Sequence, residues 1–171
     1  MEEIDLHSLG LRVAVQQKEK KGCVYFAVSK INDGIELLES GKLTIPSSMI
    51  VPEQLAYIRT NLLSIINKFD IEYAGLRITE GISKTFIPFR LNIEGVVQEL
   101  FANSSIVNYE LLTLVKLAKF LETDTDTVKD IVNGKETLEG FDEDLWSKFN
   151  KEEKEAILSS ITTLIAQEVS V

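Results

Sequence analysis

The first part of the chain has the residue pattern of β-strands. Residues 11–17 alternate between apolar and polar side chains, and residues 23–29 are apolar almost throughout, as in a strand covered on both faces. Residues 32–34, Asn-Asp-Gly, tolerate the positive φ angles that tight hairpin turns require. A third strand is predicted over residues 35–45, where Pro46 ends it because proline donates no ladder hydrogen bond. The pattern predicts an antiparallel meander of three strands.

From residue 52 onward the apolar residues recur at helical spacing. A helix is predicted over residues 52–68, with Pro52 in the first turn, where its missing N–H is not needed. A strand, a helix, a weaker strand and a short helix are then predicted at residues 73–79, 89–101, 105–110 and 114–121. A meander followed by alternating helices and strands predicts an α/β fold with a mixed sheet.

The remainder of the chain is expected to be helical and acidic. Residues 123–126 offer helix caps, and a last helix is predicted over about residues 151–168. Trp146 follows an acidic run, and we expect it to anchor the last helix in the core, with a partner contact as the alternative. The whole chain, residues 1–171, is predicted to form one domain, with a core at about 11–121 and a helical C-terminal part at about 122–171.

Charge and composition change this picture in two respects. The 171 residues carry a net charge of −9, which opposes the phosphate contacts that dominate nucleic-acid affinity. The single cysteine, Cys23, allows no disulfide within the chain, and the acidic N-terminus is unlike a signal peptide. With no apolar run of the roughly 20 residues that span a bilayer, these features predict a cytoplasmic protein.

Several common kinds of site have no support in the sequence. His7 is the only histidine, so neither a histidine triad nor a zinc site is expected. Cys23 lies in an apolar strand and is predicted to be a small core residue. There is no glycine-rich phosphate loop, and the acidic residues of 122–144 lack the spacing of a calcium loop and are predicted to form a solvated face.

Four stretches, taken in order, resemble segments of the RuvC-type Holliday junction resolvases. Residues 35–43 resemble their third strand, and residues 71–80 resemble their fourth strand, which ends in a catalytic glutamate. Residues 90–97 are similar to the following helix with its Gly-Val pair, and residues 108–116 to the fifth strand and its Val-Lys step. The resemblance covers roughly residues 11–121 and implies a ribonuclease H-like fold, in a degenerate member of that superfamily.

The resemblance also implies where catalytic residues would lie. Nucleases of this superfamily hold two Mg²⁺ ions with an Asp on the first strand, a Glu that ends the fourth strand and carboxylates of the C-terminal helix. Glu80 matches the fourth-strand position, and Glu155, followed by Ala156, loosely matches the Asp-Ala of the last helix.

The first-strand position has two alternatives. If residues 11–17 form the first strand, Gln16 or Gln17 replaces the Asp, and a neutral amide is a poor Mg²⁺ ligand. The other alignment matches Asp5 to the Asp and requires a very short first strand followed by an extra hairpin. The spacing to the next strands favours the glutamines.

Three hypotheses follow for function. The first is a ribonuclease H-like domain that has lost nuclease activity, needs no cofactor and serves as a binding or assembly module. The second is an active Mg²⁺-dependent, structure-selective nuclease that uses Asp5, Glu80 and Glu155, with Glu80 and Asp5 as metal ligands. The third is a module whose acidic segment binds a basic protein. The resemblance implies nucleic acid as a partner and a homodimer, whereas the net charge disfavours nucleic acid.

Overall fold

The computed structural model describes residues 5–16, 21–78, 80 and 87–169, with the side chains of residues 16, 21 and 169 left out. Five strands form one mixed sheet in the order β3-β2-β1-β4-β5. The strands are β1 (Leu6–Gln16), β2 (Lys21–Ile31), β3 (Ile35–Thr44), β4 (Tyr73–Arg77) and β5 (Asn108–Leu112). The helices are α1 (Val51–Lys68), α2 (Pro88–Ala102), α3 (Leu114–Phe120), α4 (Thr125–Val132), α5 (Glu143–Lys148) and α6 (Lys151–Val169).

The predicted meander is confirmed. Antiparallel β1, β2 and β3 are joined to β4 and β5 by parallel pairing of β1 with β4 and of β4 with β5. The turn at residues 32–34 is closed by a hydrogen bond from the Asn32 N–H to the Gly34 carbonyl at 3.1 Å. β1 starts earlier than predicted, because it pairs with β2 without interruption from Leu6 to Gln16.

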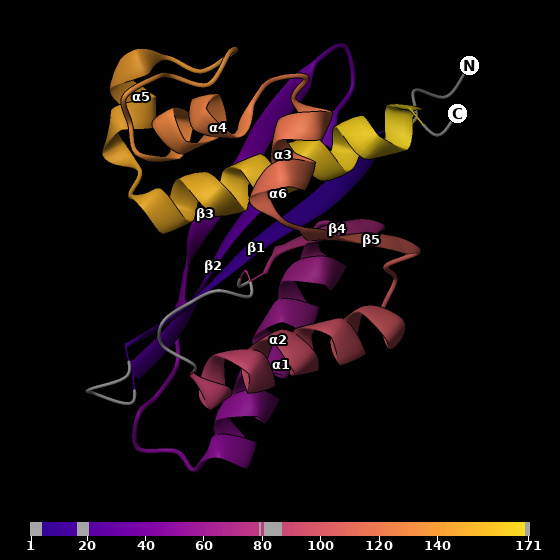
Figure 1. Ribbon diagram of the computed structural model, residues 1–171. Helices are drawn as coiled ribbons and strands as arrows, with labels where there is room; N and C mark the ends of the chain where they lie inside the picture. The colour runs from indigo at the N-terminus through magenta and orange to yellow at the C-terminus, as the bar shows by residue number, and fades with distance from the viewer. Residues whose placement is uncertain (1–4, 17–20, 79, 81–86, 170–171) are drawn as a thin grey trace.

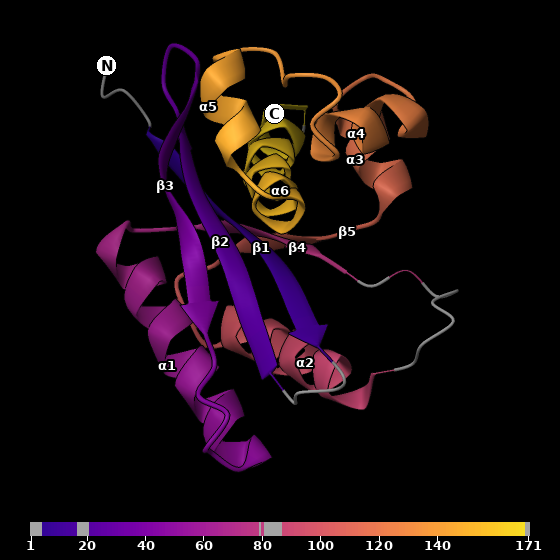
Figure 2. The same cartoon turned by 90° about the vertical axis from the view of Figure 1, so that its left-hand side faces the viewer.

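Helices cover both faces of the sheet (Figures 1 and 2). α1 and α2 lie on one face, and α6 lies across the other, with α3, α4 and α5 packed around it. Among the described residues, no helix is both long enough and apolar enough to cross a membrane.

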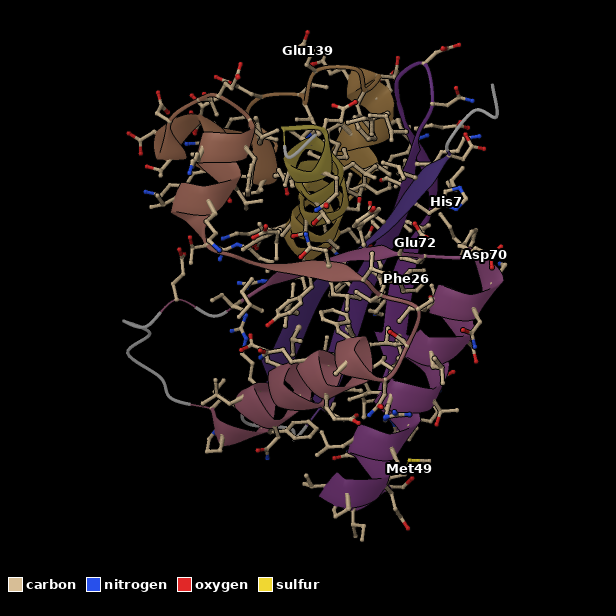
Figure 3. All side chains as sticks on the ribbon, turned by 90° about the vertical axis from the view of Figure 1, so that its right-hand side faces the viewer. His7, Phe26, Met49, Asp70, Glu72 and Glu139 are labelled. Carbon is tan, nitrogen blue, oxygen red and sulfur yellow. The ribbon has the colours of Figure 1, made fainter. Side chains whose placement is uncertain are left out.

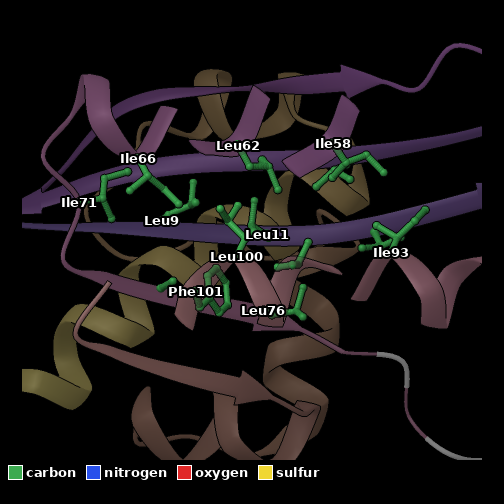
Figure 4. Packing of buried hydrophobic residues seen from close by; sticks show 14 of the residues in the cluster. Leu9, Leu11, Ile58, Leu62, Ile66, Ile71, Leu76, Ile93, Leu100 and Phe101 are labelled. Atoms are coloured by element: carbon green, nitrogen blue, oxygen red, sulfur yellow. The ribbon is translucent and has the colours of Figure 1, made fainter. Parts of the chain in front are cut away.

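The face toward α1 and α2 is a conventional apolar core (Figure 4). Leu9 and Leu11 of β1 are fully buried against Ile58 and Leu62 of α1 and Leu100 of α2. Each such side chain contributes about 1.5–3 kcal/mol by leaving water. The apolar residues whose helical spacing predicts α1 and α2 are the ones buried or partly buried at this face.

The face toward α6 is lined by small and polar residues instead. A Cβ on Gly10 would collide with the Ala156 carbonyl oxygen and the Ser160 N–H, and a Cβ on Gly75 would collide with the Thr163 hydroxyl. The Ser8 hydroxyl donates to the Ser160 carbonyl at 2.7 Å, so even the polar groups at this contact are satisfied. The backbone of α6 therefore lies almost directly on β1 and β4.

Two parts of the C-terminal region differ from the sequence predictions. β5 is Asn108–Leu112 rather than residues 105–110, because Leu112 supplies the buried side chain while Val107 is 70% exposed. The sequence did not predict α5, which begins at Glu143 and is capped by Asp142, whose side chain accepts a hydrogen bond from the Leu145 N–H. Trp146 of α5 is 1% exposed and donates to the Ile131 carbonyl, so the core-anchor interpretation is confirmed.

Candidate functional site

The tripeptide Gly-Leu-Arg occurs in both β1 and β4, and the two copies are paired in register. Gly10 lies beside Gly75, Leu11 beside Leu76 and Arg12 beside Arg77. Successive side chains of a strand point to opposite faces, so the leucines enter the core while the glycines and arginines face α6. The glycines admit the helix, and the arginines meet its first turns.

Glu155 of α6 lies between the two guanidinium groups. Its Oε2 atom is 3.0 Å from Arg77 Nε and 3.4 Å from Arg12 Nε. The side chain of Glu155 is only 5% exposed and that of Arg77 8%, so the charges are removed from water together. The Arg77 Nε–H is directed away from the line to the oxygen, which makes this contact an ion pair rather than a hydrogen bond.

The same guanidinium groups bind the carboxyl ends of the strands. Arg12 Nη1 donates to the carbonyls of Arg77 and Ile78, both at 3.1 Å. Arg77 Nη1 donates to the carbonyls of Ile78 at 2.9 Å and Leu112 at 3.3 Å. Arginine thus joins β1, β4, β5 and α6 at one point, through donors that a carboxylate does not have.

Glu80 extends this cluster beyond the end of β4. Its Oε2 accepts from Arg77 Nη2 at 3.1 Å, and its Oε1 accepts from the Leu114 N–H, at the start of α3, at 2.8 Å. Burial by itself raises the pKa of Glu80, but the Leu114 hydrogen bond and Arg77 outweigh it and hold the pKa below its usual value. Glu80 is therefore a carboxylate that is already engaged at both oxygens.

A third guanidinium approaches from α2. Arg90 Nη2 donates to the Val13 carbonyl at 3.1 Å, and its Nε lies 3.9 Å from the buried carboxylate of Glu94. Burial lowers the pKa of Arg12 to about 10, and Arg77 and Arg90 act in the same direction while Glu155 opposes them. At neutral pH Arg12 is still protonated, so the centre of the cluster is cationic on the strands and anionic on α6.

The sequence-based candidates fall into two groups. Glu80 and Glu155 are brought together, since both bind Arg77. Asp5 precedes β1 at its opposite end, seven residues before Arg12, or roughly 23 Å along a strand. The nearby His7 marks this remote end of β1 (Figure 3).

Neither Asp5 nor Gln16 lies beside the end of β4. That place is taken by Arg12, because β1 is one long strand, Leu6–Gln16, whose seventh residue pairs with Arg77. Gln16 lies four residues further along β1, outside the pairing with β4, and its side chain is outside the described part of the structure. Gln17 also lies outside the described residues.

Comparison with known proteins identifies the architecture. No protein family and no curated protein matches the sequence. The structure is similar to that of Thermus thermophilus RuvC, with a TM-score of 0.72, 11% identity and coverage of 96% of this chain and 97% of that one. The chain has a RuvC-like, ribonuclease H-like fold.

Two further solved structures share the RuvC-like fold. One is T. thermophilus RuvC in complex with a Holliday junction substrate, with a TM-score of 0.69, 11% identity and 96% coverage of both chains. The other is the yeast mitochondrial Holliday junction resolvase Ydc2, with a TM-score of 0.51, 14% identity and coverage of 94% of this chain and 80% of that one. The likeness to the RuvC-like fold therefore extends over almost the whole chain, beyond the residues 11–121 that carry the resemblance in sequence.

The residues at the expected metal site of the RuvC-like fold do not fit Mg²⁺. The last residue of β4 is Arg77, its neighbour on β1 is Arg12, and only the position on α6 holds a carboxylate. Mg²⁺ requires oxygen ligands, whereas guanidinium groups offer only donors and positive charge. Across the described ranges there is no cluster of three or more metal-ligating side chains.

Sequence reasoning misses the arginines, because the resemblance matches the end of the fourth strand to the nearest glutamate, Glu80. β4 ends three residues earlier, at Arg77. A usable signal was present: a charged residue in each of two apolar strands, preceded both times by Gly-Leu. A charged residue is almost never fully buried unless it is paired, so two arginines in strands predict a buried carboxylate partner. In the structure this partner is Glu155.

Proposed function

We propose that this chain is a RuvC-like domain without metal-dependent nuclease activity, which serves as a binding or assembly module. The observation that carries the proposal is the pair Arg12 and Arg77 on either side of Glu155. Two cationic side chains stand at the strand positions where the superfamily is expected to carry its metal-binding Asp and Glu.

Electrostatics supports this proposal. A divalent cation 4 Å from a guanidinium is opposed by roughly 8 kcal/mol at an effective dielectric constant of about 20. Two such groups act against it here, and the buried carboxylate of Glu155 contacts both of them. The two guanidinium groups balance the negative charge of Glu155. Bound metal ions would otherwise have to provide this positive charge.

An active nuclease that uses Asp5, Glu80 and Glu155 has weaker support. It would need Asp5 to leave the opposite end of β1, and it would need Glu80 and Glu155 to leave Arg77. Nucleic acid stays a candidate partner of the module, since one neighbour of the same fold is in complex with a Holliday junction substrate. The resemblance to the RuvC-type resolvases keeps a second copy of the chain as another candidate.

The test is a cleavage assay with branched and single-stranded DNA in Mg²⁺ and in Mn²⁺. We expect the purified protein to leave both substrates intact under conditions where an active resolvase cleaves. Metal-dependent cleavage that disappears in both Glu80→Gln and Glu155→Gln would overturn the proposal. Cleavage that persists in both variants would identify a contaminating nuclease, and repurification would have to remove it.

A further inference from the structure

The acidic charge of the chain is concentrated in one segment. Residues 122–144 contain nine acidic and two basic residues, a net charge of −7 out of −9 for the whole chain. This segment forms α4, the start of α5 and the loops that flank them, on the side of α6 away from the sheet. Figure 3 places Glu139 at the outer edge of this helical layer.

The acidic segment borders a cleft of about 590 Å³. Buried side chains of α4, α6 and the loop between α4 and α5 form its base, and half-buried Phe120, Phe141 and Ile165 extend the apolar surface toward solvent. Ile35, at the start of β3, is 38% exposed at its edge. The volume is within the range of about 300–1,000 Å³ that is usual for ligand sites.

The rim of the cleft carries one sign of charge. Glu122, Glu136 and Glu139 line it and are all exposed, and no lysine or arginine is among its described lining residues. None of the three glutamates forms an ion pair with a described basic residue. Their charges are therefore available to a ligand.

Hydrogen-bonded turns fix the rim before any ligand arrives. At the α3–α4 turn, Glu122 adopts a φ of 54°, and the Thr123 N–H donates to the Ala118 carbonyl at 2.9 Å. In the next loop the Lys135 N–H donates to the Asp130 carbonyl at 2.8 Å, and Gly140 adopts a φ of 89°. A preformed cleft loses little conformational entropy on binding.

We propose that this cleft binds a basic amphipathic helix of a protein partner. Apolar residues on one face of that helix would occupy the apolar base, and lysine or arginine on its flanks would meet Glu122, Glu136 and Glu139. Nucleic acid is disfavoured here, because its phosphates would face the same glutamates. This partner class rests on the proposed function, in which the chain serves as a binding module.

The test uses a short leucine–lysine peptide with helical amphipathic spacing, followed by amide chemical shifts of the full chain. We expect saturable binding with shifts confined to the α3–α4 turn, the α4–α5 loop and the facing side of α6. A serine–lysine peptide of equal charge is expected to bind at least about tenfold more weakly, because it lacks the apolar face.

Two triple variants separate the rim from net charge. Glu122→Gln, Glu136→Gln and Glu139→Gln together are expected to weaken binding by about tenfold, since each exposed pair contributes modestly. The matched control, Asp142→Asn with Glu143→Gln and Asp144→Asn, removes the same charge outside the cleft and keeps the α5 cap. We expect it to weaken binding less than about twofold.

Equal losses in the two triple variants, equal affinity for the two peptides, or shifts elsewhere on the molecule would each overturn the cleft proposal. None of these results depends on the arginine cluster. Failure here is therefore distinguishable from failure of the proposed loss of nuclease activity, which the DNA cleavage assay reports.

Discussion

The two faces of the sheet are held by different physics. Toward α1 and α2, large apolar side chains such as Leu11 and Leu62 interlock, and stability comes from area removed from water. Toward α6, glycines bring backbone against backbone, and buried ions are matched by Glu155. On the first face, one apolar residue can replace another of similar volume at modest cost in stability. On the second face, adding a single Cβ atom or removing a single charge disrupts the packing of α6. Both the site and the constraints on it lie on the second face.

The largest effect is expected from filling the contact between β1 and α6. Gly10→Val places a side chain into the Ala156 carbonyl and the Ser160 N–H, neither of which can move without displacing α6. We expect the variant not to fold, because this clash consumes much of the roughly 5–15 kcal/mol of stability that a typical domain has.

Gly95→Val is the matched control for Gly10→Val, since a Cβ at Gly95 meets nothing within 4 Å. It is expected to change stability by less than about 1 kcal/mol in urea unfolding. A folded Gly10→Val protein with near-normal stability would show that α6 does not lie as close to β1 as described.

The next largest effect is expected from removing the buried carboxylate. Glu155→Gln leaves Arg12 and Arg77 buried with no anion between them, and losing one partner of such a pair costs about 3–5 kcal/mol. Urea unfolding measures the loss. Glu153→Gln, on the same helix and only half-buried, should cost less than about 1 kcal/mol. If the two variants were equally stable, the cluster would not be an energetic unit.

A somewhat smaller effect is expected on the apolar face. Leu62→Ala removes fully buried methyl groups and should lower the free energy of unfolding by about 3 kcal/mol. Leu62→Met keeps the volume and should cost less than about 1.5 kcal/mol. Differential scanning calorimetry can compare both with wild type. If Leu62→Met were as unstable as Leu62→Ala, the apolar face would tolerate substitution no better than the face toward α6.

The smallest effect concerns pH. The pKa of Glu80 is lower in the folded state than in the unfolded chain, so its contribution is present above the unfolded pKa and is lost as pH falls through the folded pKa. Below about pH 4.5 the stability of Glu80→Gln should therefore fall less steeply than that of wild type, with a difference of less than about 1 kcal/mol. Urea midpoints across pH 3–6 would measure this difference, and parallel curves would contradict it.

The contrast between the faces also explains what could be predicted from the sequence. The meander, α1 and α2 follow from apolar periodicity, because burial against Leu9 or Ile58 leaves a repeating pattern in the sequence. The close approach of α6 to the sheet leaves almost no repeating pattern in the sequence. The buried face of α6 includes small polar residues: Ser159, Ser160, Thr162 and Thr163. Burial of small polar residues does not alternate with exposure in a way that hydropathy detects.

The arginine cluster could be predicted only by pairing distant strands. Arg12 and Arg77 are 65 residues apart, and their meeting depends on the parallel register of β1 with β4. The sequence favours Glu80 as a metal ligand because it is acidic and follows a strand, yet in the structure it accepts a hydrogen bond from Arg77. Asp5 is a candidate only through its local Ile-Asp match, and this match carries no information about the far end of a long strand.

The most direct test compares Mn²⁺ binding by wild type and by the double variant Arg12→Asp, Arg77→Glu, using calorimetry together with thermal unfolding. If the arginines stand where metal ligands would be, wild type binds no Mn²⁺ at this site. The variant then gathers three carboxylates with Glu155, binds Mn²⁺, and unfolds at a higher temperature when Mn²⁺ is present. Mn²⁺ binding by wild type that Glu155→Gln abolishes would contradict the proposal, as would a folded double variant that Mn²⁺ does not stabilise.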